Sequence, residues 1–184
     1  MARELARELL EQPLPRRWAH TRGVAEQARS LNELLGEEAD LLEAGAWLHD
    51  IGYSPTLRDY SADLPITGFH PLDGARYLRL VNVDEALCSI VAYHSGATVE
   101  ADERGLREEL EDAFESPPPH LLEAITYADM TTGPDGTHLP VERRLSEILE
   151  RYSPDDLVHR SITRSSPELT AAVQAVEKRL AEVG

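Results

Sequence analysis

The sequence predicts an all-α protein, and three observations support that fold class. Apolar residues recur at three- and four-residue spacing along most of the chain, which is the period of a helix with one buried face. No run of alternating β-branched residues is long enough to predict a sheet. Prolines and glycines divide the pattern into segments of helical length, as expected for a bundle of several helices.

The first half of the chain is expected to form five helices and one long connection. These helices span about residues 2–12, 15–35, 37–50, 71–80 and 84–95. Pro13 and Pro15 separate the first two, because proline ends a helix and is tolerated in a first turn. Residues 53–69 hold two prolines, a glycine and no helical period. Connections of that length are uncommon in compact domains unless they are functional.

The second half is expected to form four more helices within the same domain. They lie at about 105–114, from Pro117 through LLEAITYADM, at 140–152 and at 167–183. The GPDG sequence at 133–136 predicts a turn. Residues 1–184 are expected to form a single domain, with a core at about 15–150 and a C-terminal helical extension at about 151–184.

Charge limits the partners of this domain. Eighteen Lys and Arg against 34 Asp and Glu give a net charge of −16. An acidic chain is unsuited to nucleic-acid polymers, whose binding depends on neutralising phosphates, and equally unsuited to an anionic membrane surface. No apolar run approaches the length of a membrane span, and the N-terminus lacks a signal-peptide pattern, so a cytoplasmic protein is expected.

The most informative residues are His49 and Asp50, which are adjacent at the end of the otherwise apolar segment LLEAGAWLHDIG. Successive helical residues project about 100° apart, so the two side chains cannot both face solvent or both occupy one core stripe. One interpretation is local, with Asp50 capping the following turn and His49 hydrogen-bonded in the core. The other is a ligand site that accepts both groups.

His20 and Asp129 favour the ligand site. His20 precedes His49 by 29 positions, a separation that suits an antiparallel helix pair. Asp129 is a lone carboxylate near the end of an apolar helix, where a core residue is expected. Two imidazoles and two carboxylates supply the mixed nitrogen and oxygen ligands that Fe, Mn, Co, Ni or Zn accept.

Two further histidines extend this set to a two-metal site. His70 lies at the start of one expected helix and His94 at the end of the next. If Asp50 bridges, one metal is held with His20, His49 and Asp129, and a second with His70 and His94. Two metals about 3.5–4 Å apart can stabilise both the attacking and the leaving oxygen in a displacement at phosphorus. Asp50 is therefore the expected catalytic residue.

The ordered pattern of His20, His49-Asp50 and Asp129, with the sequence LHDIG, resembles the HD-domain superfamily of metal-dependent phosphohydrolases and its HDIG-containing members. The resemblance covers about residues 15–150. It implies an all-α core of five or more helices with the metal at its centre. His70 and His94 are similar to the extra ligands of the dinuclear branch, which includes diadenosine-tetraphosphate hydrolases as well as oxygenases.

The resemblance implies a phosphohydrolase that acts on a small phosphorylated substrate, a nucleotide or related phosphoester, through a metal-activated hydroxide. Two divalent transition metals per chain are expected, Fe or Mn first, with Zn, Co or Ni as the other options. One alternative is a diiron oxygenase acting on a small polyol or phosphonate, which oxygen consumption by iron-loaded protein would distinguish. Another is a non-catalytic regulatory module that keeps the ligands for stability. A homodimer is plausible for a helical domain of this size.

One departure from the family pattern concerns the phosphate-binding cation. Many phosphohydrolase members carry a lysine directly after the HDxG segment, whereas this chain has Tyr53. Arginine can replace that lysine, because its guanidinium group binds phosphate through two hydrogen bonds. Arg58 and Arg143 are the preferred candidates, since both adjoin segments with expected ligands. The other candidates are Arg16, Arg17, Arg22 and Arg144.

Overall fold

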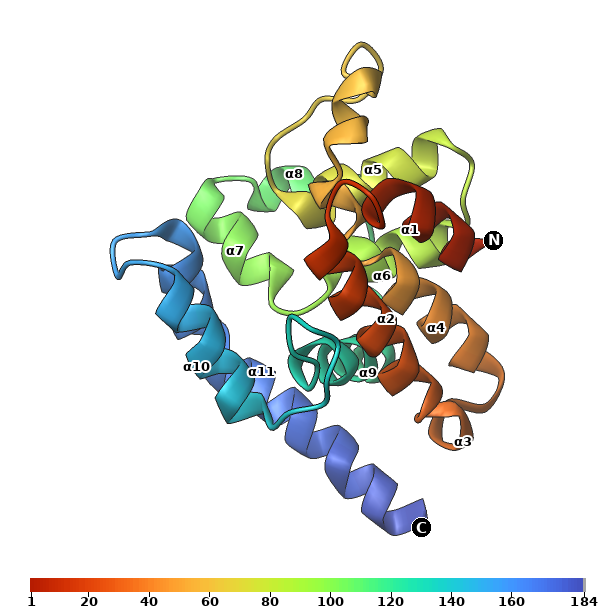
Figure 1. The fold of residues 1–184 in the computed structure, drawn as a ribbon, viewed down its shortest axis with the longest axis vertical. Coiled ribbons are helices and arrows are strands. Elements are labelled where there is room, and N and C mark those ends of the chain that lie inside the picture. Colours follow the sequence, from red (N-terminus) through yellow and green to blue (C-terminus); the bar gives the residue numbers. More distant parts are fainter. Residues whose placement is uncertain (184) are drawn as a thin grey trace.

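The computed structural model describes residues 1–183, and these residues form helices connected by turns and loops (Figure 1). No β-strand occurs in this range, and its isolated bridge joins Thr132 to His138. The all-α fold class is therefore confirmed. The helices are α1 (Ala2–Leu10), α2 (Pro15–Arg29), α3 (Asn32–Leu35), α4 (Ala39–Leu48), α5 (His70–Leu80), α6 (Glu85–Tyr93), α7 (Ala97–Arg104), α8 (Arg107–Ala113), α9 (Pro119–Met130), α10 (Val141–Arg151) and α11 (Leu157–Val183).

Helix α4 packs against four other helices, namely α1, α2, α6 and α9. Its Leu42, Ala46 and Leu48 are almost completely buried. A side chain on Gly45 would place its Cβ 2.6 Å from Ile90 Cγ2, so glycine allows α4 and α6 to approach closely. The end of α4, where His49 follows Leu48, therefore lies within the core.

A second close approach joins the turn after α4 to the start of α5. The turn is the 3₁₀ segment η2 (Ile51–Tyr53). A Cβ on Gly52 would lie 1.9 Å from the carbonyl oxygen of His70 and 2.9 Å from the backbone nitrogen of Gly74, so only glycine fits there. The Asp73 carboxylate also accepts hydrogen bonds from the backbone N–H groups of Thr67 and Gly68. The close approach at Gly52 fixes the first turn of α5 against η2, and the hydrogen bonds to Asp73 fix residues 67–68 against α5.

The long connection at 53–69 is present, and it contains one short helical element. The 3₁₀ segment η3 (Pro55–Tyr60) begins at Ser54, whose hydroxyl accepts a hydrogen bond from the N–H of Thr56. Leu57 and Leu64 anchor the connection to the core, while the tip between them projects from the bundle in Figure 1.

Three of the expected helices differ from the observed ones, and the first two lie before Ser116. The helix expected over 15–35 ends at Arg29, where the hydroxyl of Ser30 donates to the carbonyl oxygen of Gln27 and competes with the helical pattern. The polar segment before Ser116 contains two short helices, α7 and α8, rather than one. Gly105, in the left-handed conformation with φ 69°, separates them. Helix α7 has only Ala97 and Ala101 buried, so its apolar period is weak in the sequence.

The last helix begins at Leu157 rather than near Pro167, which lies inside it. Proline removes one backbone hydrogen bond and usually ends or kinks a helix. In this helix the hydroxyls of Ser165 and Ser166 donate to the carbonyl oxygens of Ser161 and Ile162 in the turn before the proline. Helix α11 packs against α7, α9 and α10, so the C-terminal extension covers one side of the core (Figure 1).

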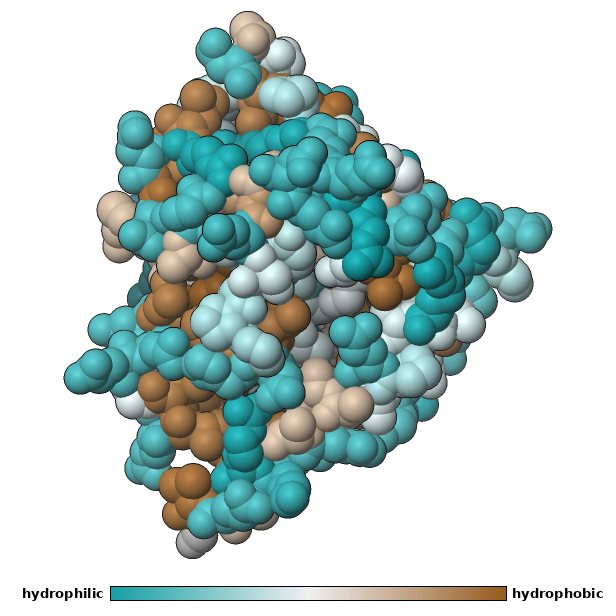
Figure 2. Space-filling view, turned by 180° about the vertical axis from the view of Figure 1, so that it is seen from behind, coloured by the Kyte–Doolittle hydropathy of each residue, from teal (hydrophilic) through white to brown (hydrophobic). Residues whose placement is uncertain are grey.

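Figure 2 shows the face opposite to that of Figure 1, where hydrophilic side chains cover much of the surface and apolar residues reach it in scattered groups. This agrees with a chain in which 28% of the residues are charged. Among the described residues, no helix combines the length and the apolar character that crossing a membrane requires.

The close approach at Gly52 predicts a stability effect. We expect Gly52→Ala to lower the free energy of unfolding by about 1–3 kcal/mol, because the added methyl group forces η2 and α5 apart. Chemical denaturation measures this change. Asp59→Ala, an exposed position in η3, is the control and is expected to change stability by no more than about 0.5 kcal/mol. Equal stability of the Gly52→Ala variant and the parent would contradict the packing described.

Candidate metal centre

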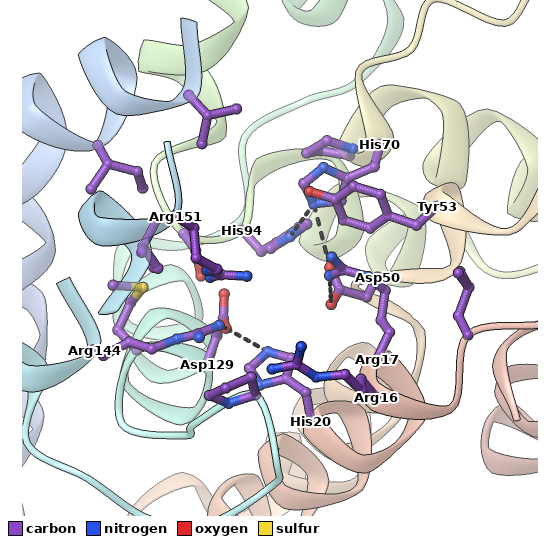
Figure 3. A pocket seen from close by; sticks show the side chains of 18 of the residues that line it. Arg16, Arg17, His20, Asp50, Tyr53, His70, His94, Asp129, Arg144 and Arg151 are labelled. Carbon is purple, nitrogen blue, oxygen red and sulfur yellow. Dashed lines mark hydrogen bonds and ion pairs between the residues drawn. The ribbon is translucent and has the colours of Figure 1, made fainter. Parts of the chain in front are cut away.

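The six expected ligand residues come together at one cavity of about 480 Å³ (Figure 3). His49 is fully buried behind the cavity wall. The other five are among the residues that line the cavity, namely His20, Asp50, His70, His94 and Asp129. They come from α2, the end of α4, α5, the end of α6 and α9, so distant parts of the chain meet at this point.

The first of two clusters contains His20, His49 and Asp129. One nitrogen or oxygen atom from each lies within 4.8 Å of the others, close enough for one metal ion. His20 Nε2 is 3.0 Å from Asp129 Oδ1. All three side chains are buried.

The second cluster contains Asp50, His70 and His94, whose ligand atoms also lie within 4.8 Å of one another. The Nε2 atoms of His70 and His94 face each other at 3.2 Å. Asp50 connects the two clusters, because its Oδ1 is 3.4 Å from His70 Nε2 and its Oδ2 is 3.4 Å from His49 Nε2. A carboxylate with one oxygen toward each cluster is the geometry expected of a bridging ligand.

Backbone carbonyl groups orient three of the imidazole rings. The Nδ1 atoms of His20, His49 and His94 lie 3.0, 2.8 and 2.7 Å from the carbonyl oxygens of Gly133, Ala46 and Val91. A carbonyl oxygen can only accept, so each Nδ1 carries the proton and donates it. Nε2 of each ring is then the atom that faces the ligand clusters, and it becomes a metal ligand once it carries no proton, which is the arrangement that metal-binding histidines use.

The donor atoms of the site fit a divalent transition metal. His49 Nε2 is buried and has no hydrogen-bond partner. An unpaired buried polar atom is costly, and coordination to a metal ion would remove that cost. Four imidazoles and two carboxylates are also the ligand types that Fe, Mn, Co, Ni and Zn accept.

The two carboxylates of the site are held in their charged forms. Burial raises the pKa of Asp50, but the positive charges of Arg17 and His49 outweigh it and hold that pKa well below its usual range. Burial likewise raises the pKa of Asp129, and the hydrogen bond from His20 together with the charge of His49 outweighs it. Both side chains are therefore ionised, as metal ligands must be.

The histidines of the two clusters differ in their pKa values. Burial lowers the pKa of His49, yet the carboxylates of Asp50 and Asp129 raise it to about 9. Burial lowers the pKa of both His70 and His94 and outweighs the opposing effect of the Asp50 carboxylate, and the charge of His49 adds to the lowering. Without metal, His49 is thus protonated near neutral pH while the other two rings are neutral.

Arg17 contacts the second cluster directly. Its Nη1 lies 2.5 Å from Asp50 Oδ2, and its guanidinium carbon lies 3.5 Å from the centre of the Tyr53 ring. The Tyr53 ring stacks on His70 with 3.9 Å between ring centres. Tyr53 therefore supports a cation on one face and a ligand imidazole on the other.

Arg144 lies beside the first cluster. Its Nη2 is 3.9 Å from Asp129 Oδ1, and its buried Nε atom has no hydrogen-bond partner. Only 7% of the residue is exposed, so this positive charge is held inside the protein. Figure 3 shows Arg17 beside Asp50 and Arg144 beside Asp129, at two ends of the ligand array.

The structure places neither Arg58 nor Arg143 among the cavity-lining residues, and both are exposed. Arg58 lies in η3, which projects away from the bundle. Arg143 precedes Arg144 on α10, and a rotation of about 100° between successive residues turns one outward when the other faces inward. The arginines that do line the cavity are Arg16, Arg17, Arg144 and Arg151.

Arg151 is the lining cation that sequence reasoning missed. It lies seven positions after Arg144, which is two helical turns, so the two share a face of α10. Combining that spacing with the buried position of Arg144 would have identified it.

A comparison with protein families matches residues 17–133 to the family described as HD domain. This range includes all six residues of the two clusters, from His20 to Asp129. Comparisons with curated proteins and with solved structures found no match.

The raised pKa of His49 predicts that metal binding to metal-free protein depends on pH. Below a pKa of about 9 the ring must lose its proton to become a ligand, so affinity should rise with pH, by up to about tenfold per unit between pH 7 and 8. Calorimetric titration with Mn²⁺ in buffers of different ionisation enthalpy measures both affinity and proton release. About one proton released per chain is expected, and pH-independent affinity without proton release would contradict the assignment.

Proposed function

The chain belongs to the HD domain family, and from that premise we propose that it is a metal-dependent phosphohydrolase acting on a small phosphorylated molecule, a nucleotide or related phosphoester. HD domains bind divalent metals and are commonly hydrolases. The observation that carries the proposal is the pair of three-residue ligand clusters at one cavity lined by four arginines.

We assign one divalent ion to each cluster, with Fe or Mn as the first choice and Zn, Co or Ni as alternatives. His20, His49 and Asp129 would hold one ion, and His70 and His94 the other. Asp50, with one oxygen toward each cluster, would hold both. Such a pair of ions lowers the pKa of water toward neutrality and stabilises negative charge on phosphate oxygens. No serine or cysteine nucleophile is required.

The arginines next to the clusters are suited to binding the phosphate group. Arg17 and Arg144 present guanidinium groups beside Asp50 and Asp129, where they can donate hydrogen bonds to phosphate oxygens not involved in the reaction. Arg17 also supplies the positive charge that is missing at position 53. Where many related hydrolases carry a lysine, this chain has a tyrosine ring that supports the Arg17 cation.

The charge of the cavity differs from that of the whole chain. Four arginines line the cavity, together with three carboxylates from Asp50, Glu100 and Asp129. The cavity is therefore positive before any metal is counted, whereas the chain carries −16. Two divalent ions would increase that local charge. An acidic exterior slows the approach of an anionic substrate but does not prevent its binding.

Removal of the shared carboxylate tests the proposed chemistry. We expect Asp50→Ala to lose at least one of the metal ions per chain and to lower hydrolysis of phosphoester substrates by at least about a hundredfold, since even partners outside the ligand set can cost that much. Elemental analysis and a panel of phosphomonoester and phosphodiester substrates measure the two effects. Asp63→Ala, an exposed position, is the control. Retention of both metal content and hydrolysis by Asp50→Ala would rule the proposal out.

Substitution of the arginines tests the assignment of the phosphate-binding groups. Under metal saturation, we expect Arg17→Ala and Arg144→Ala each to raise KM by about tenfold to a hundredfold, the loss expected for a hydrogen bond to a charged group. Arg58→Ala and Arg143→Ala are matched controls and should change KM less than about twofold, because both side chains lie outside the cavity. A larger increase in KM for the two control variants than for Arg17→Ala and Arg144→Ala would contradict the assignment.

A further inference from the structure

Residues beyond the matched range build one wall of the cavity. The match to the HD domain family ends at residue 133. Six residues after this range line the cavity, and they come from α10, its C-terminal cap and the first turns of α11. They are Arg144, Ile148, Arg151, Tyr152, Val158 and Ile162. Figure 3 shows Arg144 and Arg151 across the cavity from His70, Tyr53 and Arg17. We call these six residues the C-terminal wall.

The face of α10 that belongs to this wall carries an apolar side chain between two charged ones. Arg144, Ile148 and Arg151 follow one another at spacings of four and three, so they lie along one face of the helix. Glu147 restrains both arginines, because its two oxygens accept hydrogen bonds from Arg144 Nη1 at 2.7 Å and bind Arg151 Nε at 3.0 Å. The guanidinium groups are thus positioned before any ligand binds.

The apolar part of the wall has no role in binding a bare phosphate. Ile148 is 7% exposed, whereas Val158, Ile162 and Tyr152 are only half-buried in the described chain. Met130 at the end of α9 lines the same cavity and is almost completely buried. Half-buried apolar side chains at a cavity gain stability when a ligand removes them from water. They therefore indicate an organic group joined to the phosphate.

We propose that the C-terminal wall binds this organic group and that the group carries an aromatic ring, an inference that rests on the proposed phosphoester hydrolysis. Three of the lining side chains favour an aromatic neighbour. The Met130 thioether contacts ring edges, the Tyr152 ring stacks, and the Arg151 guanidinium binds to ring faces.

Polyol phosphates fit this wall poorly. Their hydroxyl groups would lose water against Ile148, Val158 and Ile162, none of which can donate or accept a hydrogen bond. The cavity of about 480 Å³ is within the range of small-molecule sites. The wall thus selects among phosphoesters by the ring of the ester group, while the metal clusters and Arg17 bind the phosphate common to all of them.

Binding of two inert analogues to the metal-loaded full chain tests this inference without depending on turnover. Phenylphosphonate and methylphosphonate share the anionic group and differ in the ring. Calorimetric titration should give at least about tenfold tighter binding of phenylphosphonate. Tyr152→Ala should reduce this preference at least about threefold, and Tyr152→Phe should retain it because the stacking ring remains. Glu150→Ala, an exposed position on α10, should leave both affinities unchanged.

The outcomes separate this inference from the proposed function. Equal affinity for the two phosphonates in the unmodified protein, or a preference that Tyr152→Ala leaves intact, would overturn the aromatic wall and leave phosphoester hydrolysis standing. Failure of both phosphonates to bind the metal-loaded protein would overturn the anion-binding cavity and, with it, the inference. Thermal unfolding of each variant shows whether a lost preference comes from a lost fold.

Discussion

The buried carboxylate of Asp50 is the constraint on which the rest of the site depends. A charged carboxylate removed from water is stable only when other charges and hydrogen-bond donors surround it. Here His49 comes from the same helix end, His70 from α5, and Arg17 from α2. Each of these neighbours requires its own packing, including the contact of Gly52 with the backbone of His70. The helix ends that meet here therefore supply the charges that compensate this group.

The cluster residues were predictable because the sequence places polar groups where apolar ones are expected. His49 and Asp50 end an apolar helix, and Asp129 interrupts another, so each breaks the local period. Their expected convergence matches the two clusters that the structure brings together. The all-α fold class was predictable from the three- and four-residue spacing of the apolar residues. Helix α7 was not predicted because a helix with two buried alanines leaves almost no apolar pattern.

The arginines that line the cavity were not predictable from proximity in sequence. Arg143 adjoins the turn after Asp129, yet the phase of α10 turns Arg144 inward instead. Arg58 follows the ligand pair closely, but η3 carries it away from the cavity. The extent of α11 was hidden by Pro167, because proline usually ends or kinks a helix, whereas here it lies inside one. For both arginine pairs, the phase or path of the local element decides which residue faces the site, and closeness in sequence does not.

We propose that each of the two clusters holds one metal ion and that Asp50 is shared between them. Elemental analysis of protein purified without chelator, compared with His94→Ala, tests it most directly. The geometry of the clusters predicts two divalent ions per chain in the parent and about one in the variant, which keeps the complete set of His20, His49 and Asp129. Zero or one ion per chain in the parent would contradict the two-metal site.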